Sequence, residues 1–308
     1  MLPAFVSLLD RQMLFVTGKG GVGKTVVTAA LALASERSGR RTIVVEVGGQ
    51  SRIPALLGAE AVRPGDEARI GDDLWATTIE PYRVMEEWIG RILGSKRLTS
   101  LLTRSNFFRA FAEAAPGGRE LGSTVKTWEL AQPERWDRKR RGYDMVIVDG
   151  PAMGHAIGML RTPQTFADIA RVGPIASQSE RVREWLGDPR RTAYVAVALP
   201  AELPVSETLD LGGRLRRAIG RRLEAIVVNG VVPDRFSEKE LRALAKADGE
   251  EGDAARAARG AQARAVNQRE HVDRLVSEAD APVLELPFLF APALDRSHVE
   301  QLADRLEL

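Results

Sequence analysis

A glycine-rich segment that ends in a lysine and a threonine carries the clearest chemistry in the sequence. It reads Gly18-Lys19-Gly20-Gly21-Val22-Gly23-Lys24-Thr25 and follows a short apolar run. The spacing matches the phosphate-loop pattern G-x-x-x-x-G-K-T, whose glycines let backbone N–H groups surround phosphate oxygens. In that pattern Lys24 neutralises the β- and γ-phosphates, and the hydroxyl of Thr25 binds Mg²⁺. We therefore predict that residues 18–26, which end at Val26, bind a purine nucleoside triphosphate as Mg-ATP.

The same segment also satisfies the dinucleotide-binding pattern G-x-G-x-x-G, through Gly18, Gly20 and Gly23. Glu46, at the end of the next apolar run, would then hold the ribose. A dinucleotide turn, however, has no need of a lysine followed by a threonine, whereas a triphosphate site requires both. Lys24 and Thr25 therefore favour ATP over NAD as the ligand.

An aspartate stands at the end of another apolar run. The stretch from Tyr143 to Asp149 is typical of a strand, and the loop Gly150-Pro151-Ala152-Met153-Gly154-His155 follows it. An aspartate in this position orients Mg²⁺, directly or through water, and a glycine-containing loop after it follows the γ-phosphate. We therefore expect Thr25 and Asp149 to hold the metal ion, and Lys24 and Asp149 to act in catalysis.

Runs of β-branched residues separated by helical patterns indicate the fold class. A helix is expected over Lys24–Arg37, with Gly39 just past its end. Strands are expected at residues 13–16, 42–47, 74–79, 145–148, 194–199, 225–228 and 282–286. Continuous apolar strands that alternate with helices are typical of a mostly parallel sheet covered by helices on both faces. The prediction is a single α/β domain of the P-loop NTPase type over residues 1–308.

Two segments interrupt this alternation. Residues 82–135 have no strand pattern, and their apolar residues fall at helical spacing, namely Trp88, Ile89, Ile92, Leu93, Leu98, Leu101, Leu102, Phe107, Phe108 and Phe111. We predict a helical subdomain inserted between two strands, with its apolar stripe in the core. Residues 237–279 are rich in Ala, Arg and Glu. They predict a charged, solvent-facing helix pair with a flexible tip, interrupted by Gly249 and Gly252.

The composition excludes several kinds of site. The 308 residues include no cysteine and only three histidines, which are far apart in the sequence, so disulfides, iron–sulfur clusters and thiolate zinc sites are excluded. The net charge of +2 comes from charges of mixed sign, and we expect no nucleic-acid partner. No stretch approaches the ~20 apolar residues of a membrane-spanning helix, and residues 2–9 make a poor signal peptide. The expected location is the cytoplasm.

The phosphate loop and the aspartate-containing loop resemble those of a known group of ATPases. The extra lysine Lys19 resembles the deviant phosphate loop of the signature-lysine ATPases, in which that lysine reaches the nucleotide of the facing subunit. The stretch Asp149–His155 resembles the Asp-x-Ala-Pro-Thr-Gly-His switch of the anion-transporting (arsenite pump) ATPase family. That family includes the guided-entry factors that carry tail-anchored membrane proteins. The resemblance implies a dimer in which Lys19 is catalytic together with Lys24 and Asp149.

Three later segments extend the resemblance over most of the chain. Residues 199–208 resemble the family's Pro-Glu…Glu-Thr segment, 227–229 resemble its Val-Val-Asn, and 286–289 resemble the loop that covers the base. The resemblance thus implies further nucleotide-binding residues, which are Glu202, Asn229 and Pro287.

The sequence departs from the family's pattern at several positions, so not every property of the family is expected of this chain. The zinc of guided-entry dimers and the metal site of arsenite pumps need cysteines, which this chain lacks, so we expect neither zinc nor arsenite. The guided-entry client groove is methionine-rich, whereas residues 82–135 contain only Met85. In the family an aspartate after the second strand positions the attacking water, and aligning strand ends puts Gly48 there. Another alignment makes Glu46 that acid; we prefer Gly48 because Glu46 should lie within the strand.

Together these patterns predict an ATP-binding and ATP-hydrolysing switch that is a weak ATPase because of Gly48. It would work as a homodimer, or as a heterodimer with a homologous ATPase, and couple its ATP state to a hydrophobic client or a membrane protein. The alternative is a nucleotide-binding regulatory subunit with little hydrolysis, paired with an active homologue.

Overall fold

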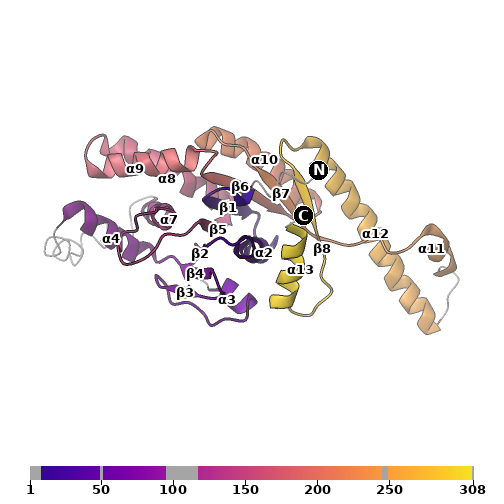
Figure 1. Cartoon of the computed structure of the whole chain (residues 1–308). Helices are drawn as coiled ribbons and strands as arrows, with labels where there is room; N and C mark the ends of the chain where they lie inside the picture. The colour runs from indigo at the N-terminus through magenta and orange to yellow at the C-terminus, as the bar shows by residue number, and fades with distance from the viewer. Residues whose placement is uncertain (1–7, 49–50, 95–116, 245–248, 307–308) are drawn as a thin grey trace.

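The computed structural model describes residues 8–48, 51–94, 117–244 and 249–306. In these ranges eight strands form one sheet in the order β3-β4-β2-β5-β1-β6-β7-β8 (Figure 1). The strands are β1 (Met13–Gly18), β2 (Thr42–Glu46), β3 (Glu67–Arg69), β4 (Leu74–Thr78), β5 (Met145–Ala152), β6 (Thr192–Ala198), β7 (Ala225–Val231) and β8 (Val283–Pro287). All neighbours are parallel except β3 and β4. The predicted mostly parallel α/β sheet is confirmed.

Several of the strands are longer than the apolar runs from which they were predicted. β1 continues to Gly18 and β5 to Ala152, because backbone pairing does not require apolar side chains. The sequence analysis missed β3, a three-residue antiparallel edge strand that begins with Glu67 and ends with Arg69. Short charged strands protect a sheet edge from pairing with other chains, and they leave no apolar run to detect.

Helices cover both faces of the sheet, as predicted. Those described are α2 (Lys24–Arg37), α3 (Ile53–Leu56), α4 (Pro81–Leu93), α7 (Gly118–Leu130), α8 (Met153–Ala170), α9 (Pro174–Gly187), α10 (Glu202–Ile219), α11 (Glu238–Leu244), α12 (Gly249–Glu278) and α13 (Arg296–Leu306). Residues of α2 and α13 pack with Leu14 and Val16 of β1. Residues of α4, α7, α8 and α10 pack with Met13 and Phe15. Successive residues of β1 therefore supply two opposite core layers.

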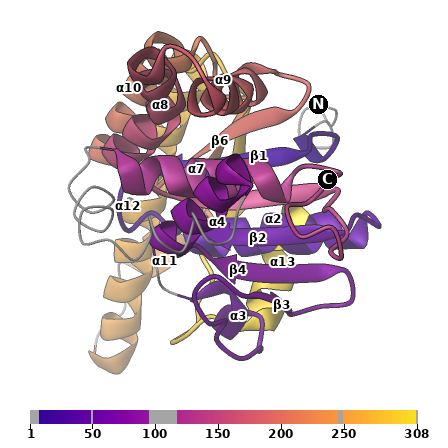
Figure 2. The same ribbon diagram turned by 90° about the vertical axis from the view of Figure 1, so that its left-hand side faces the viewer.

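Helices α4 and α7 lie in the segment that was predicted as a helical insert, and they are neighbours in front of the strands in Figure 2. Met85 and Trp88 of α4 are buried with Leu121 and Val125 of α7 in the core shared with β1. Trp88 of the predicted stripe is therefore packed core, and Ile89 is partly buried against it. The side chains of Ile92 and Leu93 are outside the described part of the structure, as are the remaining predicted members of the stripe, Leu98, Leu101, Leu102, Phe107, Phe108 and Phe111.

The charged segment contains α11 and α12, and Figure 1 shows α12 running past β8 and extending with α11 away from the sheet. Gly249 and Gly252 were predicted to interrupt the helices; Gly249 begins α12 after α11 has ended at Leu244, whereas Gly252 lies within α12 and does not interrupt it. Both glycines lie in the first turn of α12, where the backbone N–H groups have no helical partner to lose. The predicted flexible tip falls on residues 245–248, outside the described residues. In the described ranges, no helix combines the length and apolar character needed to cross a membrane.

Candidate nucleotide-binding site

The predicted phosphate loop connects the end of β1 to the start of α2. Gly21 and Gly23 have φ angles of 83° and 88°, a left-handed conformation that favours glycine. A side chain at Gly23 would also collide with Asn229, whose Nδ2 would lie 2.2 Å from the added Cβ. The loop therefore turns tightly onto the N-terminus of α2, where unpaired N–H groups and the helix dipole attract phosphate.

Lys24 and Thr25, the first two residues of α2, lie at the predicted metal and phosphate position. The ammonium of Lys24 donates a hydrogen bond to the carbonyl oxygen of Lys19 at 3.0 Å. Burial lowers the pKa of Lys24, and the charge of Asp149 opposes that shift. The hydroxyl of Thr25 donates to Oδ2 of Asp149 at 2.7 Å. The structure thus brings three predicted residues of the phosphate loop, Lys19, Lys24 and Thr25, together with Asp149 from β5.

Two buried carboxyl groups stand side by side at this edge of the sheet. Glu46 ends β2 and is directly opposite Asp149 of β5 in the parallel register. Oε1 of Glu46 accepts hydrogen bonds from the backbone N–H groups of Arg52 at 2.7 Å and Ile53 at 3.2 Å. Burial raises the pKa of Glu46 to about 7, those two hydrogen bonds oppose the rise, and the charge of Asp149 adds to it. Burial likewise raises the pKa of Asp149, against the hydrogen bond from Thr25 and the charge of Lys24.

Each of these carboxyl groups has one oxygen that is buried and has no hydrogen-bond partner among the described residues. The two atoms are Oδ1 of Asp149 and Oε2 of Glu46. Buried polar atoms are rarely left without a partner, and such a pair of oxygens needs a compensating cation. Mg²⁺ prefers hard oxygen ligands, and one or two carboxylates with phosphate oxygens commonly hold it. Thr25 and Asp149 therefore fit the metal ion of Mg-ATP.

A cavity of about 610 Å³ opens over the loop. One wall comes from the phosphate loop and includes Lys24, Thr25 and Val26, and the other comes from residues 51–56 around α3. Arg52, in this second wall, has an exposed side chain, and its charge lowers the pKa values of Glu46 and Asp149 against the effect of burial. The cavity is of a size that suits the phosphate groups of a nucleotide. Arg52 was not predicted, because no motif marks it.

Lys19 lies in the loop but points to α10. Its ammonium makes an ion pair with Oε1 of Glu207 at 3.1 Å, and both side chains are about one third exposed. Glu207 was named in the sequence only as part of the segment 199–208 and was not predicted as a partner of Lys19. The spacing of 188 residues between them leaves no local sequence signal for this contact.

The residues implied for the base are placed differently from one another. Asn229 of β7 donates from Nδ2 to the carbonyl oxygen of Val22 at 3.0 Å, so it belongs to the loop site. Pro287 ends β8, opposite Val231 of β7. Glu202, by contrast, is largely exposed and makes its ion pair with Arg274 of α12 at 2.8 Å. The described contacts therefore join Asn229 to the phosphate loop but place Glu202 against α12.

Gly48 follows β2 in a turn, and Glu46 is the last residue within the strand. Among the described residues, which omit 49–50, no atom lies within 4 Å of a Cβ built on Gly48. With respect to these residues the position has room for a side chain and carries none.

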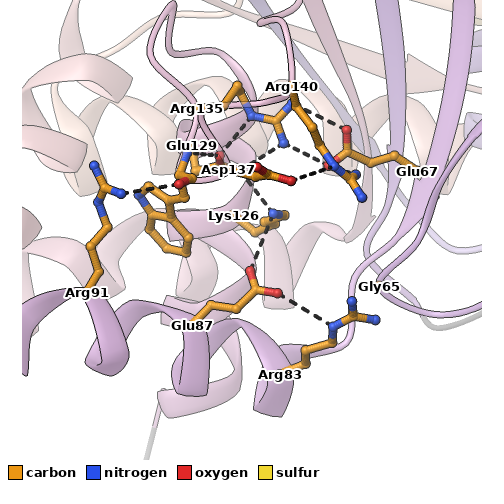
Figure 3. Close-up of a pocket in the computed structure, with 11 residues that line it drawn as sticks. Gly65, Glu67, Arg83, Glu87, Arg91, Lys126, Glu129, Arg135, Asp137 and Arg140 are labelled. Carbon is orange, nitrogen blue, oxygen red and sulfur yellow. Dashed lines mark hydrogen bonds and ion pairs between the residues drawn. The ribbon is translucent and has the colours of Figure 1, made fainter. Parts of the chain in front are cut away.

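A separate cavity of about 420 Å³ lies between α4, α7 and the β3 edge of the sheet, away from the phosphate loop (Figure 3). Arg135 is buried there between Glu67 at 2.7 Å and Glu129 at 2.8 Å. Arg140 adds a second ion pair to Glu67 at 3.0 Å, and Lys126 adds one to Glu129 at 3.0 Å. Because these charges neutralise one another, we assign the cluster a structural role, which is to hold α7 to the edge of the sheet.

Comparison with known proteins agrees with this site. The anion-transporting ATPase family matches residues 11–172, which is 162 of 308 residues and includes the phosphate loop and Asp149–His155. The chain is 29% identical over 239 residues to the ATPase BagA of Mycobacterium tuberculosis, covering 76% of this chain and 69% of that protein. It is 26% identical over 251 residues to an arsenical pump-driving ATPase of Escherichia coli, covering 76% of this chain and 41% of that longer protein. With its phosphate loop, its Thr25–Asp149 pair and this match, the chain belongs to the anion-transporting ATPase family.

Proposed function

We propose that this chain binds and hydrolyses Mg-ATP in the cytoplasm as a dimeric switch. The 2.7 Å contact between the Thr25 hydroxyl and Asp149, beside Lys24, is the observation that carries the proposal. This contact supports binding of the metal and phosphate groups at the N-terminus of α2, where an anion is favoured. Membership of the anion-transporting ATPase family supports ATP hydrolysis.

Hydrolysis at this site is an in-line attack of water on the γ-phosphate, in which positioning and charge stabilisation supply most of the rate. Lys24 neutralises charge on the transferred phosphoryl group within one subunit, and Lys19 does so from the facing subunit. Asp149 and Thr25 hold Mg²⁺, which neutralises charge on the phosphate oxygens when it is bound. Gly48 offers no carboxylate for the water, so turnover by the chain alone is slow.

The ATP state would control a hydrophobic client or a membrane protein. The chain has no cysteine, so neither a zinc-joined dimer nor a cysteine-bound arsenite fits it. A second candidate function is that of a nucleotide-binding regulatory subunit with little hydrolysis, in a heterodimer with an active homologue. The absence of a side chain at Gly48 favours this candidate, whereas the Lys24, Thr25 and Asp149 arrangement favours the enzyme, as a homodimer or as a heterodimer.

Single-turnover hydrolysis of Mg-ATP by excess purified protein tests the proposal. The wild type should release phosphate slowly, and Thr25→Val should release it at least about 10²-fold more slowly because the hydroxyl that holds Mg²⁺ is lost. Thr165→Val, on the exposed side of α8, is the matched control and should behave as the wild type does. Equal rates for Thr25→Val and the wild type contradict the proposed enzyme. Tight ATP binding with no phosphate release in any variant supports the regulatory subunit.

A further inference from the structure

A cavity of about 300 Å³ lies beside Gly48 and shares no lining residue with the phosphate-loop cavity. Four segments line it, namely the turn after β2, the segment that joins β4 to α4, the N-terminal half of α7, and the end of β5 with the first turns of α8. Its ionisable side chains are Arg119, Glu120 and His155. In the structure as described, no hydrogen bond or ion pair joins these three side chains to other residues. The mechanism above gives Glu120 no role.

The order of the strands places this cavity where the attacking water must be. Asn229 on β7, implied by the family resemblance for the base, contacts the phosphate loop after β1, and Asp149 lies in the C-terminal half of β5. A nucleotide laid along these positions points its γ-phosphate toward β2, the neighbour of β5. In-line attack puts the water beyond the γ-phosphorus, over the ends of β2 and β4. Gly48 and Ile79, which follow those two strands, both line the cavity.

We propose that Glu120 supplies the carboxylate that accepts a hydrogen bond from the attacking water, in place of the side chain that Gly48 lacks. This inference rests on the proposed function. Glu120 is the only carboxylate among the residues described as lining the cavity. It stands in the first turn of α7. His155, the other candidate base, has a more exposed side chain than Glu120.

The position of Glu120 is fixed by the packing of α7. The hydroxyl of Thr124 donates to the carbonyl oxygen of Met159 in α8 at 3.2 Å. A Cβ on Gly122 would lie 3.0 Å from the carbonyl oxygen of Pro81, so α7 approaches the start of α4 closely. α7 therefore holds Glu120 against the loop that follows Asp149, as water positioning requires.

The step is balanced as an ordinary hydrolysis. The water oxygen forms a bond to the γ-phosphorus, while the bond from that phosphorus to the β,γ-bridging oxygen breaks and its electron pair stays on ADP. One proton of the water passes to the carboxylate of Glu120 and is later released to solvent. The products are ADP and inorganic phosphate.

Single-turnover phosphate release, measured beside ATP affinity by calorimetry, tests the proposal. Glu120→Gln should slow release about 10²-fold with ATP affinity unchanged, because water positioning acts in the transition state. Glu120→Asp should recover part of the rate. The control Glu86→Gln makes the same charge change on α4, outside this cavity, and should release phosphate at the wild-type rate. In a Gly48→Asp background, Glu120→Gln should slow phosphate release much less than it does in the wild type, because the new carboxylate positions the same water.

Four results overturn the inference. Glu120→Gln releases phosphate at the wild-type rate, or it loses ATP affinity, or a slowing of equal size also appears in Glu86→Gln. Undetectable release by the wild type in a single turnover overturns it as well. If instead His155→Gln slows release while Glu120→Gln does not, the base lies on the loop and the assignment to α7 is wrong. Failure of the wild type to bind Mg-ATP is a different outcome, because it overturns the proposed function itself.

Discussion

Lys19 and Glu207 form an ion pair within one chain, with 3.1 Å between Nζ and Oε1. Lys19 is the residue proposed to reach the nucleotide of a facing subunit, and a lysine engaged with α10 of its own chain is not free to do so. In the proposed dimer, Lys19 would therefore have to exchange Glu207 for phosphate as its partner. On that proposal, Glu207 would restrain Lys19 until a second subunit and a nucleotide are present.

This contact predicts opposite effects for its two partners. Lys19→Ala should abolish the association that a non-hydrolysable ATP analogue induces and still bind the analogue. Glu207→Gln should strengthen that association by up to about 5-fold, because a part-exposed ion pair contributes only ~0–1 kcal/mol. Light scattering at several protein concentrations measures both, with Glu180→Gln on α9 as the control. A Lys19→Ala variant that responds like the wild type means that Lys19 is a simple surface charge.

Gly48→Asp should raise the hydrolysis rate of the isolated chain about 10²-fold or more with little change in ATP affinity. The substitution adds a carboxylate beside the proposed water position, and an added Cβ meets no atom of the described residues within 4 Å, so the fold accommodates it. Steady-state phosphate release measures the hydrolysis rate, and calorimetry measures the ATP affinity. Brisk hydrolysis by the unmodified chain would contradict it, and loss of that activity in Glu46→Gln would then identify Glu46 as the base.

Arg135→Met should lower the free energy of unfolding by ~3–5 kcal/mol near neutral pH, because it leaves Glu67 and Glu129 buried without their cation. Burial alone would raise the pKa of each carboxyl, but the hydrogen bonds and charge of Arg135 hold both pKa values below that of an ordinary glutamate. The stability from these pairs is present above the ordinary glutamate pKa and is lost as the pH falls through the lowered pKa values.

The difference in stability between Arg135→Met and the wild type should therefore narrow on acidification. Urea unfolding at pH 7.5 and at about pH 4 measures it. Arg140→Met, whose guanidinium is half exposed, is the control and should cost no more than ~1 kcal/mol. A loss of less than ~1 kcal/mol for Arg135→Met would show that the buried cluster in Figure 3 does not hold α7 to the sheet.

Hydrogen exchange in α7 should depend on the nucleotide. The side chains of Arg119 and Glu120 line one cavity with Gly48 and His155, so a change in the loops at the γ-phosphate alters the surroundings of the first turns of α7. Exchange of residues 118–130 should differ between the ADP and non-hydrolysable ATP states, whereas α13, on the other face of the sheet, should not respond. Identical exchange of α7 in the ADP and ATP-analogue states would mean that α7 is part of the packed core and does not respond to the nucleotide.

Local sequence patterns predicted the sheet because its strands are buried on both faces and so consist of continuous apolar residues. They predicted the phosphate loop because its glycines, Lys24 and Thr25 are adjacent in the chain. The short charged strand β3 lacks any such run, and Gly252 was misread as a break because glycine in the first turn of a helix differs little from glycine in a loop.

Contacts between segments that are distant in the chain could not be predicted from the sequence. The Lys19–Glu207 pair joins residues 188 positions apart, and Arg52 enters the site only because Glu46 accepts hydrogen bonds from the backbone at the start of α3. The cavity that joins Gly48 to α7 likewise depends on how close α7 approaches α4 and α8. These contacts depend on how helices and strands pack across the whole sheet, so no single segment of the sequence has a pattern that predicts them.

Calorimetric titration of the wild type and Lys24→Ala with Mg-ATP is the most direct test of the nucleotide site. The wild type should bind Mg-ATP and should not bind NAD tightly. Lys24→Ala should weaken ATP binding at least about 10²-fold, because charge-assisted hydrogen bonds to phosphate are lost. Lys126→Ala, on α7 and away from the loop, should bind as the wild type does. Unchanged ATP affinity in Lys24→Ala, or tight binding of NAD by the wild type, would contradict the assignment of this loop to ATP.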